Sequence, residues 1–222
     1  MTDELQLWQK ARLAGLSDMV GNAEALEALR AFRTGFLLLS GPIGTGKTST
    51  AIAFVRERSG VLLEEGQTLS IPDKYFVQHV HAVEFEVSTS TARKFWFCHE
   101  AQTFLIVDEA QDLRKAQWSR LKTIAPRPSL TIIFCTSEPE TIEPSLVDRC
   151  THVRLGPLSA RELKPMVERA CSLKGIPYNA TILPALNKAG VFRPRAILNV
   201  VEAVARGIPA DRAVVGQSGL GV

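Results

Sequence analysis

The sequence predicts an α/β fold, in which a parallel sheet covered by helices is followed by a small all-helical domain. Three apolar runs have the length and composition of buried parallel strands. They lie at 36–39, 103–107 and 130–135. A glycine-rich turn or polar residues follow each run, and only helical patterns remain from Leu158 onward. We therefore expect an α/β domain at 1–156, a helical lid domain at 157–210 and a tail at 211–222.

The other elements of the first domain follow in order along the chain. An alanine- and leucine-rich helix begins after the turn-like pair Gly21-Asn22, and a second helix begins where the glycine-rich turn ends. Pro126 and Pro128 end a later helix before the third apolar strand. The expected ranges are helices at 23–31, 48–58, 91–101 and 113–124, a loop-rich stretch at 60–74 and a further strand at 80–87.

The second domain is predicted from helix caps and helical spacing. Ser159 is the residue type that commonly caps a helix N-terminus, and apolar residues recur at helical spacing after it. The expected helices lie at 161–173, 181–189 and 196–205. Three short helices are enough to form a small lid beside the sheet.

Composition narrows the class of protein. The chain has 222 residues, of which 45% are hydrophobic, and a net charge of +3, which permits nucleic-acid binding without indicating it. No apolar run approaches the roughly 18 residues of a membrane span, and the N-terminus has no signal-peptide form. Four widely spaced cysteines support neither a zinc site nor a disulfide framework. We expect a cytoplasmic protein with no membrane partner.

The first strand runs directly into a complete Walker A loop, Gly-Pro-Ile-Gly-Thr-Gly-Lys-Thr at 41–48. Its glycines let successive backbone N–H groups face phosphate oxygens, and the following helix directs its positive end at the same anion. Lys47 reaches the β- and γ-phosphates, and the Thr48 hydroxyl ligates Mg²⁺. The motif therefore predicts a site for ATP and Mg²⁺. The expected nucleotide-binding residues are Gly41, Pro42, Gly44, Thr45, Gly46, Lys47, Thr48 and Ser49.

The second apolar strand ends in an acidic pair, Asp108-Glu109, which has the form of a Walker B site. Asp108 can hold Mg²⁺, and Glu109 can polarise the water that attacks the γ-phosphate. The third apolar strand ends in Thr136-Ser137, whose hydroxyls lie beside the acidic pair if the two strands are neighbours. Either hydroxyl can contact the γ-phosphate or the attacking water, although Ser and Thr are also common turn formers.

With these motifs the chain resembles the AAA+ ATPases, and within them the clamp-loader group that includes replication factor C and the bacterial γ complex. The segment 16–22 is similar to the family's adenine-contacting box, which places Val20 against the nucleotide. The run 142–150 is similar to the clamp-loader Ser-Arg-Cys segment, with Asp148 in place of Ser. The resemblance implies a P-loop AAA+ parallel-sheet domain and a helical lid, without the group's C-terminal collar domain.

The resemblance also implies roles for single residues. Arg149 would be an arginine finger that enters a neighbouring subunit's ATP site; its alternative is local capping or pairing with Asp148. Ser137 would be sensor one. Arg195, in the segment 190–199, would be the sensor-two residue that reaches back to the phosphates, with Arg193 as the alternative.

DNA contacts are expected at the starts of two helices, as in the related loaders. Hydroxyls and cations there suit phosphate contacts, although exposed helices also carry Lys and Arg for solubility. The candidate residues are Ser88, Arg93 and Lys94 in the first segment, and Arg114 and Lys115 after the Walker B strand. Glu86 stands where the family tends to carry an Asn or Asp that restrains the catalytic Glu.

Together these features predict an ATP hydrolase that works within a homo- or hetero-oligomer of AAA+ subunits to remodel or load a DNA-replication partner on DNA. The expected partners are DNA and a sliding clamp, a helicase or a recombinase-type protein. One alternative is a DNA-associated loader or regulator of a helicase, recombinase or transposase. Another is a non-hydrolysing, ATP-dependent scaffold subunit, although intact Lys47, Asp108 and Glu109 count against it.

Overall fold

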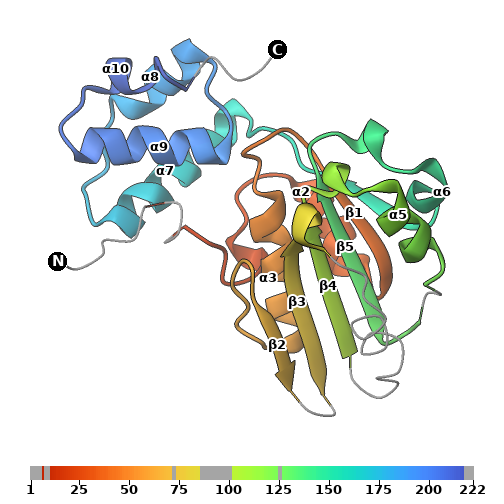
Figure 1. The fold of residues 1–222 in the computed structure, drawn as a ribbon. Helices are drawn as coiled ribbons and strands as arrows, with labels where there is room; N and C mark the ends of the chain where they lie inside the picture. Colours follow the sequence, from red (N-terminus) through yellow and green to blue (C-terminus); the bar gives the residue numbers. More distant parts are fainter. Residues whose placement is uncertain (1–6, 8–10, 72–73, 86–101, 125–126, 218–222) are drawn as a thin grey trace.

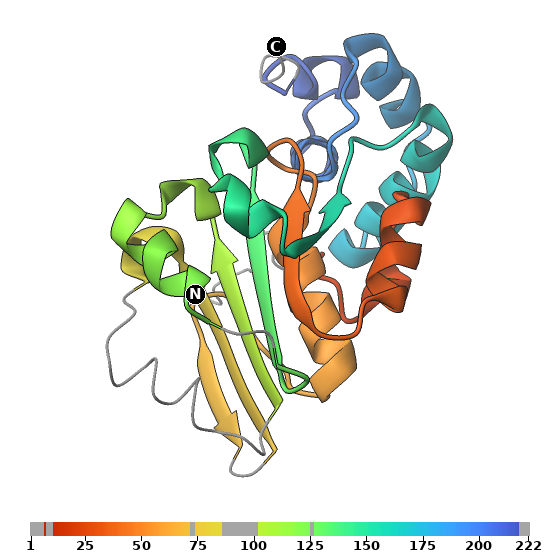
Figure 2. The same ribbon diagram turned by 90° about the vertical axis from the view of Figure 1, so that its right-hand side faces the viewer.

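The fold has two parts, a sheet flanked by helices and a cluster of helices beside it (Figure 1). It is taken from a computed structural model, and the residues that this structure describes are 7, 11–71, 74–85, 102–124 and 127–217. The helical part lies near the end of the sheet at which the parallel strands terminate (Figures 1 and 2). This end of a parallel sheet is where α/β proteins generally bind their ligands.

Six strands of the described residues form one sheet in the order β2-β3-β4-β5-β1-β6. All neighbouring strands pair in parallel, except that β2 is antiparallel to β3. The strands are β1 (Gly35–Ser40), β2 (Thr68–Ile71), β3 (Tyr75–His81), β4 (Gln102–Asp108), β5 (Leu130–Thr136) and β6 (Cys150–Arg154). The strand β1 lies between β5 and β6, although it comes first in the sequence, so the Walker A loop emerges near the middle of the sheet.

Helices cover both faces of the sheet, which explains why β1, β4 and β5 are apolar throughout. Leu37 and Leu39 point to the face covered by α2 and α3, and Phe36 and Leu38 point to the face covered by α5 and α6. Side chains of a strand alternate between the two faces, so both faces of β1 need apolar residues. These helices are α2 (Ala23–Ala31), α3 (Lys47–Ser59), α5 (Lys115–Lys122) and α6 (Pro144–Val147).

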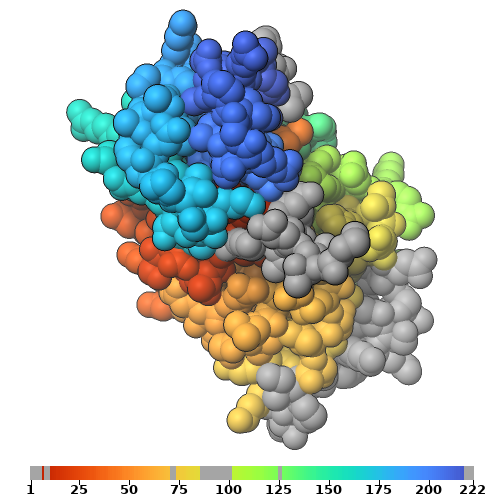
Figure 3. All heavy atoms as spheres, turned by 90° about the vertical axis from the view of Figure 1, so that its left-hand side faces the viewer, coloured from red at the N-terminus to blue at the C-terminus, as the bar shows by residue number. Residues whose placement is uncertain are grey.

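The helices that follow the sheet form a hydrophobic core of their own, which Leu7 joins. They are α7 (Ala160–Lys174), α8 (Ile182–Ala189), α9 (Pro194–Ala205) and α10 (Ala210–Ala213). Ser159 precedes α7, and its backbone N–H donates to the Glu162 carboxylate at 2.6 Å, which closes the first turn of the helix. In Figure 3, α7 (cyan) lies against the N-terminal residues (red), where Arg169 donates to the Asp18 carbonyl.

Most of the expected elements are confirmed within one or two residues, but three predictions were wrong. The strand expected at 80–87 is instead β3, which ends at His81 and is followed by a 3₁₀ turn. The stretch expected to be a loop contains β2, and β6 was not predicted. The helix expected at 91–101 lies outside the described residues.

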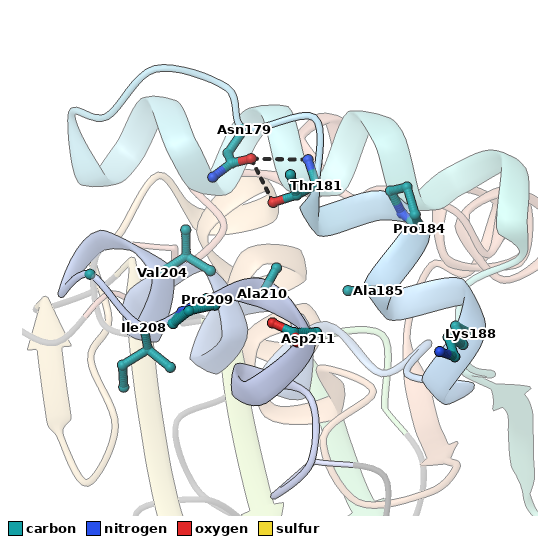
Figure 4. Close-up of a pocket in the computed structure, with 11 residues that line it drawn as sticks. Asn179, Thr181, Pro184, Ala185, Lys188, Val204, Ile208, Pro209, Ala210 and Asp211 are labelled. Carbon is teal, nitrogen blue, oxygen red and sulfur yellow. Dashed lines mark hydrogen bonds between the residues drawn. The ribbon is translucent and has the colours of Figure 1, made fainter.

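The helical part carries a hollow of about 620 Å³ between α8, α9 and α10 (Figure 4). Most of its lining is apolar, with Lys188 and Asp211 as charged members. The Asn179 side-chain oxygen accepts hydrogen bonds from the Thr181 N–H and hydroxyl groups, at 2.9 and 2.7 Å (Figure 4). None of the residues that line this hollow belongs to the motifs identified from the sequence.

Candidate functional site

The loop between β1 and α3 has a backbone that requires glycine at three positions. Gly41, Gly44 and Gly46 have φ angles of 147°, 84° and 96°, in the region that other residues rarely adopt. A Cβ at Gly41 would lie 2.0 Å from the Leu155 carbonyl oxygen, and one at Gly44 would lie 3.2 Å from Cβ of Arg195. The loop is therefore held tightly between the sheet and the start of α9.

Lys47 is a buried cation at the start of α3. Its Nζ donates to the carbonyl oxygens of Gly41 at 2.8 Å and Pro42 at 3.2 Å. Burial lowers the pKa of this ammonium group, and nearby acidic groups only partly offset the effect. Among the described residues no carboxylate lies within ion-pair distance of Nζ, so the charge is suited to an incoming anion.

The Walker A and Walker B motifs meet through one hydrogen bond. The Thr48 hydroxyl donates to Oδ2 of Asp108 at 2.8 Å, and the Glu109 N–H donates to Oδ1 at 3.1 Å. Burial alone raises the pKa of Asp108, but its contacts with His79 and Thr48 outweigh burial and hold the pKa below its usual value. Asp108 is therefore an ionised carboxylate beside a hydroxyl, which is a suitable pair of oxygen donors for Mg²⁺.

Two histidines of β3 lie next to this carboxylate. His81 is paired in register with Asp108, and the Nε2 atom of the fully buried His79 lies 3.7 Å from Oδ2 of Asp108. The other ring nitrogen of His79 accepts the Gly66 N–H at 2.8 Å, so the ring proton is on Nε2 and faces the carboxylate. Sequence analysis missed both residues because it placed this strand too late in the chain.

Glu109 is one of two residues other than glycine with positive φ in the described chain, with φ of 49°. This left-handed conformation turns the chain sharply at the end of β4 and leaves the Glu109 side chain exposed. Its carboxylate accepts a hydrogen bond from the Gln111 side chain at 2.7 Å. Strained backbone of this kind is frequent at functional sites.

A cavity of about 560 Å³ brings most of the expected site residues together. This volume falls in the range of small-molecule sites. The expected residues that line it are Val20, Gly44, Thr45, Gly46, Lys47, Thr48, Ser49, Asp108, Glu109 and Arg195. Gly41, Pro42, Ser137 and Arg149 are not among its lining residues.

The lining of the cavity also includes an apolar set that the motifs did not reveal. It consists of Ala11, Leu13, Met19, Val20, Met166 and Leu198. These residues come from three separate segments, so no local pattern in the sequence marks them. Arg169 of α7 lines the cavity too and anchors the lid helix to the N-terminal segment through its contacts with Asp18. The cavity thus combines a polar phosphate-type surface with apolar side chains suited to a base.

The structure distinguishes the two arginines near the start of α9. Arg195 lines the cavity, and its backbone N–H donates to the Gly44 carbonyl at 3.2 Å. Arg193 is the residue that precedes α9 and is not part of the cavity lining. The geometry therefore favours Arg195 as the cation of the lid that faces the Walker A loop.

Arg149 makes local contacts. Its guanidinium donates to the carbonyl oxygens of Lys122 at 2.8 Å and Ile124 at 3.0 Å, and it lies over the Phe36 ring at 5.1 Å from the centroid. It thereby caps the carboxyl end of α5, where helices present unpaired carbonyls. These partners differ from the Asp148 pairing considered from the sequence, and the role in a neighbouring subunit stays a prediction.

Ser137 follows β5 directly, and β5 is the neighbour of β4 in the sheet. The sequence-based expectation that the two strand ends lie side by side is thus met. Ser137 Oγ lies 3.5 Å from Nε2 of Gln111. The residue is close to the acidic pair without lining the cavity itself.

Part of the predicted DNA-contacting surface can be placed. Arg114 and Lys115 are exposed at the start of α5, and the Arg114 N–H donates to the Gln117 side-chain oxygen at 2.6 Å. The remaining candidates lie outside the described residues, as does the proposed restraining residue. They are Ser88, Arg93, Lys94 and Glu86.

None of the helices in the described ranges is both long and apolar enough to span a bilayer.

Comparisons with known proteins agree with this site. The model of the "ATPase family associated with various cellular activities (AAA)" matches residues 37–158, which is just over half of the chain. DNA polymerase III subunit gamma/tau of Mycobacterium bovis is 28% identical over 241 residues, covering 98% of this chain and 42% of that protein. Replication factor C subunit 3 of Schizosaccharomyces pombe is 26% identical, covering 88% of this chain and 58% of that protein.

The chain thus spans about half the length of these curated relatives. A solved structure, the Thermotoga maritima RuvB Holliday junction branch migration motor, superposes with a TM-score of 0.67 at 19% identity. That match covers 94% of this chain and 72% of the RuvB chain and supports the fold. The relatives confirm the resemblance to the clamp-loader group. The chain belongs to the AAA family of ATPases.

Proposed function

We propose that this protein binds and hydrolyses ATP within an oligomer of AAA+ subunits, and that it uses this turnover to remodel or load a DNA-replication partner on DNA. The observation that carries the proposal is the cavity in which Lys47, Thr48, Asp108 and Glu109 meet below Arg195. Phosphate, metal and water each have a matching group there. Intact hydrolytic residues argue against a scaffold that only binds ATP.

The residues fit Mg²⁺-ATP on three counts. The glycines form a concave backbone cradle at the start of α3, where N–H groups and the helix dipole attract phosphate. The buried Lys47 ammonium has only carbonyl partners and gains an anionic one. Thr48 and Asp108 would hold Mg²⁺, which when bound neutralises charge on the β- and γ-phosphates.

In the proposed reaction, Glu109 orients a water molecule and accepts its proton. The water oxygen bonds to the γ-phosphorus while the bond from that phosphorus to the bridging oxygen of the leaving ADP breaks. Lys47 and Arg195 stabilise the negative charge that spreads over the transferred group. Ser137 contributes through its position beside Glu109.

We further propose that residues 157–210 act as a lid on the domain formed by 1–156, with 211–222 as a tail. The contacts of Arg195 with Gly44 and of Arg169 with Asp18 join the lid to the nucleotide cavity. ATP would therefore bind between the two parts and couple their relative position to hydrolysis. Arg149, which does not line the cavity of its own chain, would serve a neighbouring subunit's site.

The DNA part of the proposal rests on the exposed basic start of α5 and on the relatives. Replication factor C and DNA polymerase III subunits bear names from DNA replication, and the RuvB structure is named a branch migration motor. A sliding clamp, a helicase or a recombinase-type protein would be the loaded partner. Arg114 and Lys115 would contact phosphates without reading sequence.

The test is the native mass of the protein with and without ATP and primed DNA. The proposal expects assemblies of several chains that form or tighten with ATP and associate with primed DNA. A constant monomer under all conditions would overturn the oligomeric loader. ATP hydrolysis without DNA association would leave a regulator that contacts a protein partner instead.

A further inference from the structure

The strongest feature outside the motifs is a chain of hydrogen bonds at the ends of β4 and β5. Gln111, which sits in the 3₁₀ turn after β4, lies between the Glu109 carboxylate and the Thr136 hydroxyl. Its Nε2 donates to Oε2 of Glu109 at 2.7 Å, and its Oε1 accepts from the Thr136 hydroxyl at 2.7 Å. The same Nε2 lies 3.5 Å from the Ser137 hydroxyl.

The direction of each hydrogen bond in this chain follows from chemistry. The Glu138 N–H donates to the Thr136 hydroxyl oxygen at 3.0 Å, so the hydroxyl proton is available to donate to Gln111. A carboxylate can only accept, so the NH₂ group of the Gln111 amide must face Glu109. Both assignments agree, and they leave one orientation for the Gln111 amide.

The chain begins at a rigid point. Thr136 is fully buried at the end of β5, and its carbonyl accepts the N–H of Gly41, the first glycine of the Walker A loop, at 3.3 Å. At the other end, Glu109 is exposed and carries the left-handed backbone conformation. The buried strand end therefore fixes Gln111, and Gln111 fixes a carboxylate that would otherwise sample several rotamers.

We propose that Gln111 is a positioning residue for ATP hydrolysis, which holds the Glu109 carboxylate in place through a link to Thr136. One carboxylate oxygen is occupied by Gln111, and the other stays available to accept the proton of the attacking water. This inference rests on the proposed role of Glu109 as the water-activating group. It adds the residue that determines where that group points.

The test uses Gln111→Met, which keeps the length of the side chain and removes both hydrogen bonds. We expect kcat for ATP hydrolysis to fall about tenfold, which is less than the loss of the base itself, while the ATP dissociation constant changes less than about twofold. Glu109→Gln measured in parallel gives the loss that complete removal of the base causes. A general loss of packing would instead move nucleotide affinity and thermal stability together.

A second variant tests the link to the strand. Thr136→Val removes the hydroxyl that anchors Gln111, and Thr131→Val makes the same change in the same strand at a buried hydroxyl without a hydrogen-bond partner. We expect Thr136→Val to lower kcat and Thr131→Val to leave it unchanged. The double variant of Thr136→Val with Gln111→Met should lose no more than Gln111→Met alone, because both changes break one chain.

Two results overturn this inference in distinguishable ways. If Glu109→Gln loses turnover but Gln111→Met keeps the parent kcat or exceeds it, Gln111 does not position the base, and the proposed function stands. If Glu109→Gln hydrolyses ATP normally, the role of Glu109 is wrong and that of Gln111 fails with it. Additive losses in the double variant would show that Thr136 and Gln111 act separately.

Discussion

Replacing Glu109 with glutamine should separate ATP binding from ATP hydrolysis. The Glu109 carboxylate lines the cavity, and its described side-chain partner is Gln111. A glutamine at this position still offers an oxygen to the Gln111 amide, so the local structure should persist. The amide, however, cannot accept a proton from water. The variant therefore removes the proposed chemistry and leaves the geometry.

The expected magnitudes follow from the position of the residue. A positioned general base contributes about 10²- to 10⁴-fold, and tenfold in rate corresponds to about 1.4 kcal/mol, so the barrier should rise by about 3 to 5 kcal/mol. Binding should hold or tighten slightly, because Glu109 adds negative charge near Lys47 and the triphosphate is also negative. The thermal midpoint should stay within a few degrees, since the side chain is exposed.

The assay pairs equilibrium binding of a fluorescent ATP analogue with steady-state phosphate release. Asp112→Asn is the matched control, because Asp112 is an exposed carboxylate on the same turn that does not line the cavity. The control should bind and hydrolyse ATP like the parent protein. Parent-like turnover in Glu109→Gln would refute the Walker B assignment, and equal losses in both variants would point to a damaged turn.

The remaining predictions concern neighbouring subunits and DNA. Arg149→Ala should bind ATP normally and hydrolyse it poorly, and mixing it with Lys47→Ala protein should restore activity, because each variant supplies what the other lacks; no rescue in assemblies shown to be mixed would assign Arg149 to capping α5. Reversing Arg114 and Lys115 to Glu should weaken DNA binding for all sequences alike and reduce its salt dependence by about one unit of slope per phosphate contact, with ATP affinity unchanged. The control reverses two exposed cations of α8 and α10, Lys188 and Arg212. Equal effects in both charge reversals would mean that net charge and not the α5 surface determines DNA affinity.

The sequence predicted those parts of the fold where local pattern and burial agree. The strands β1, β4 and β5 are apolar at nearly every position because both faces are covered, and this makes them visible. The edge strand β6 was missed because its residues are mostly exposed, with Val153 the buried one. The strand β3 was misplaced because His79 and Gln78 interrupt its apolar pattern, although His79 is buried against Asp108.

The candidate site divides in the same way. The phosphate-binding groups lie in continuous motifs, where a glycine loop or an acidic pair has a direct physical reason to be in that order. The apolar lining does not, because Met19, Met166 and Leu198 meet only after the lid packs on the sheet domain. Gln111 was likewise invisible as a functional residue, since its partner Thr136 is brought to it by the pairing of β4 with β5.

The most direct test of the account is the affinity of the protein for ATP in the presence of Mg²⁺, compared with that of Lys47→Ala. The account predicts that the parent protein binds and hydrolyses ATP, whereas Lys47→Ala remains folded and loses binding, because a buried cation that faces the phosphates has been removed. The matched control is Lys188→Ala, which removes a cation outside this cavity. Parent-like ATP affinity in a folded Lys47→Ala protein would contradict the assignment of the cavity as the nucleotide site.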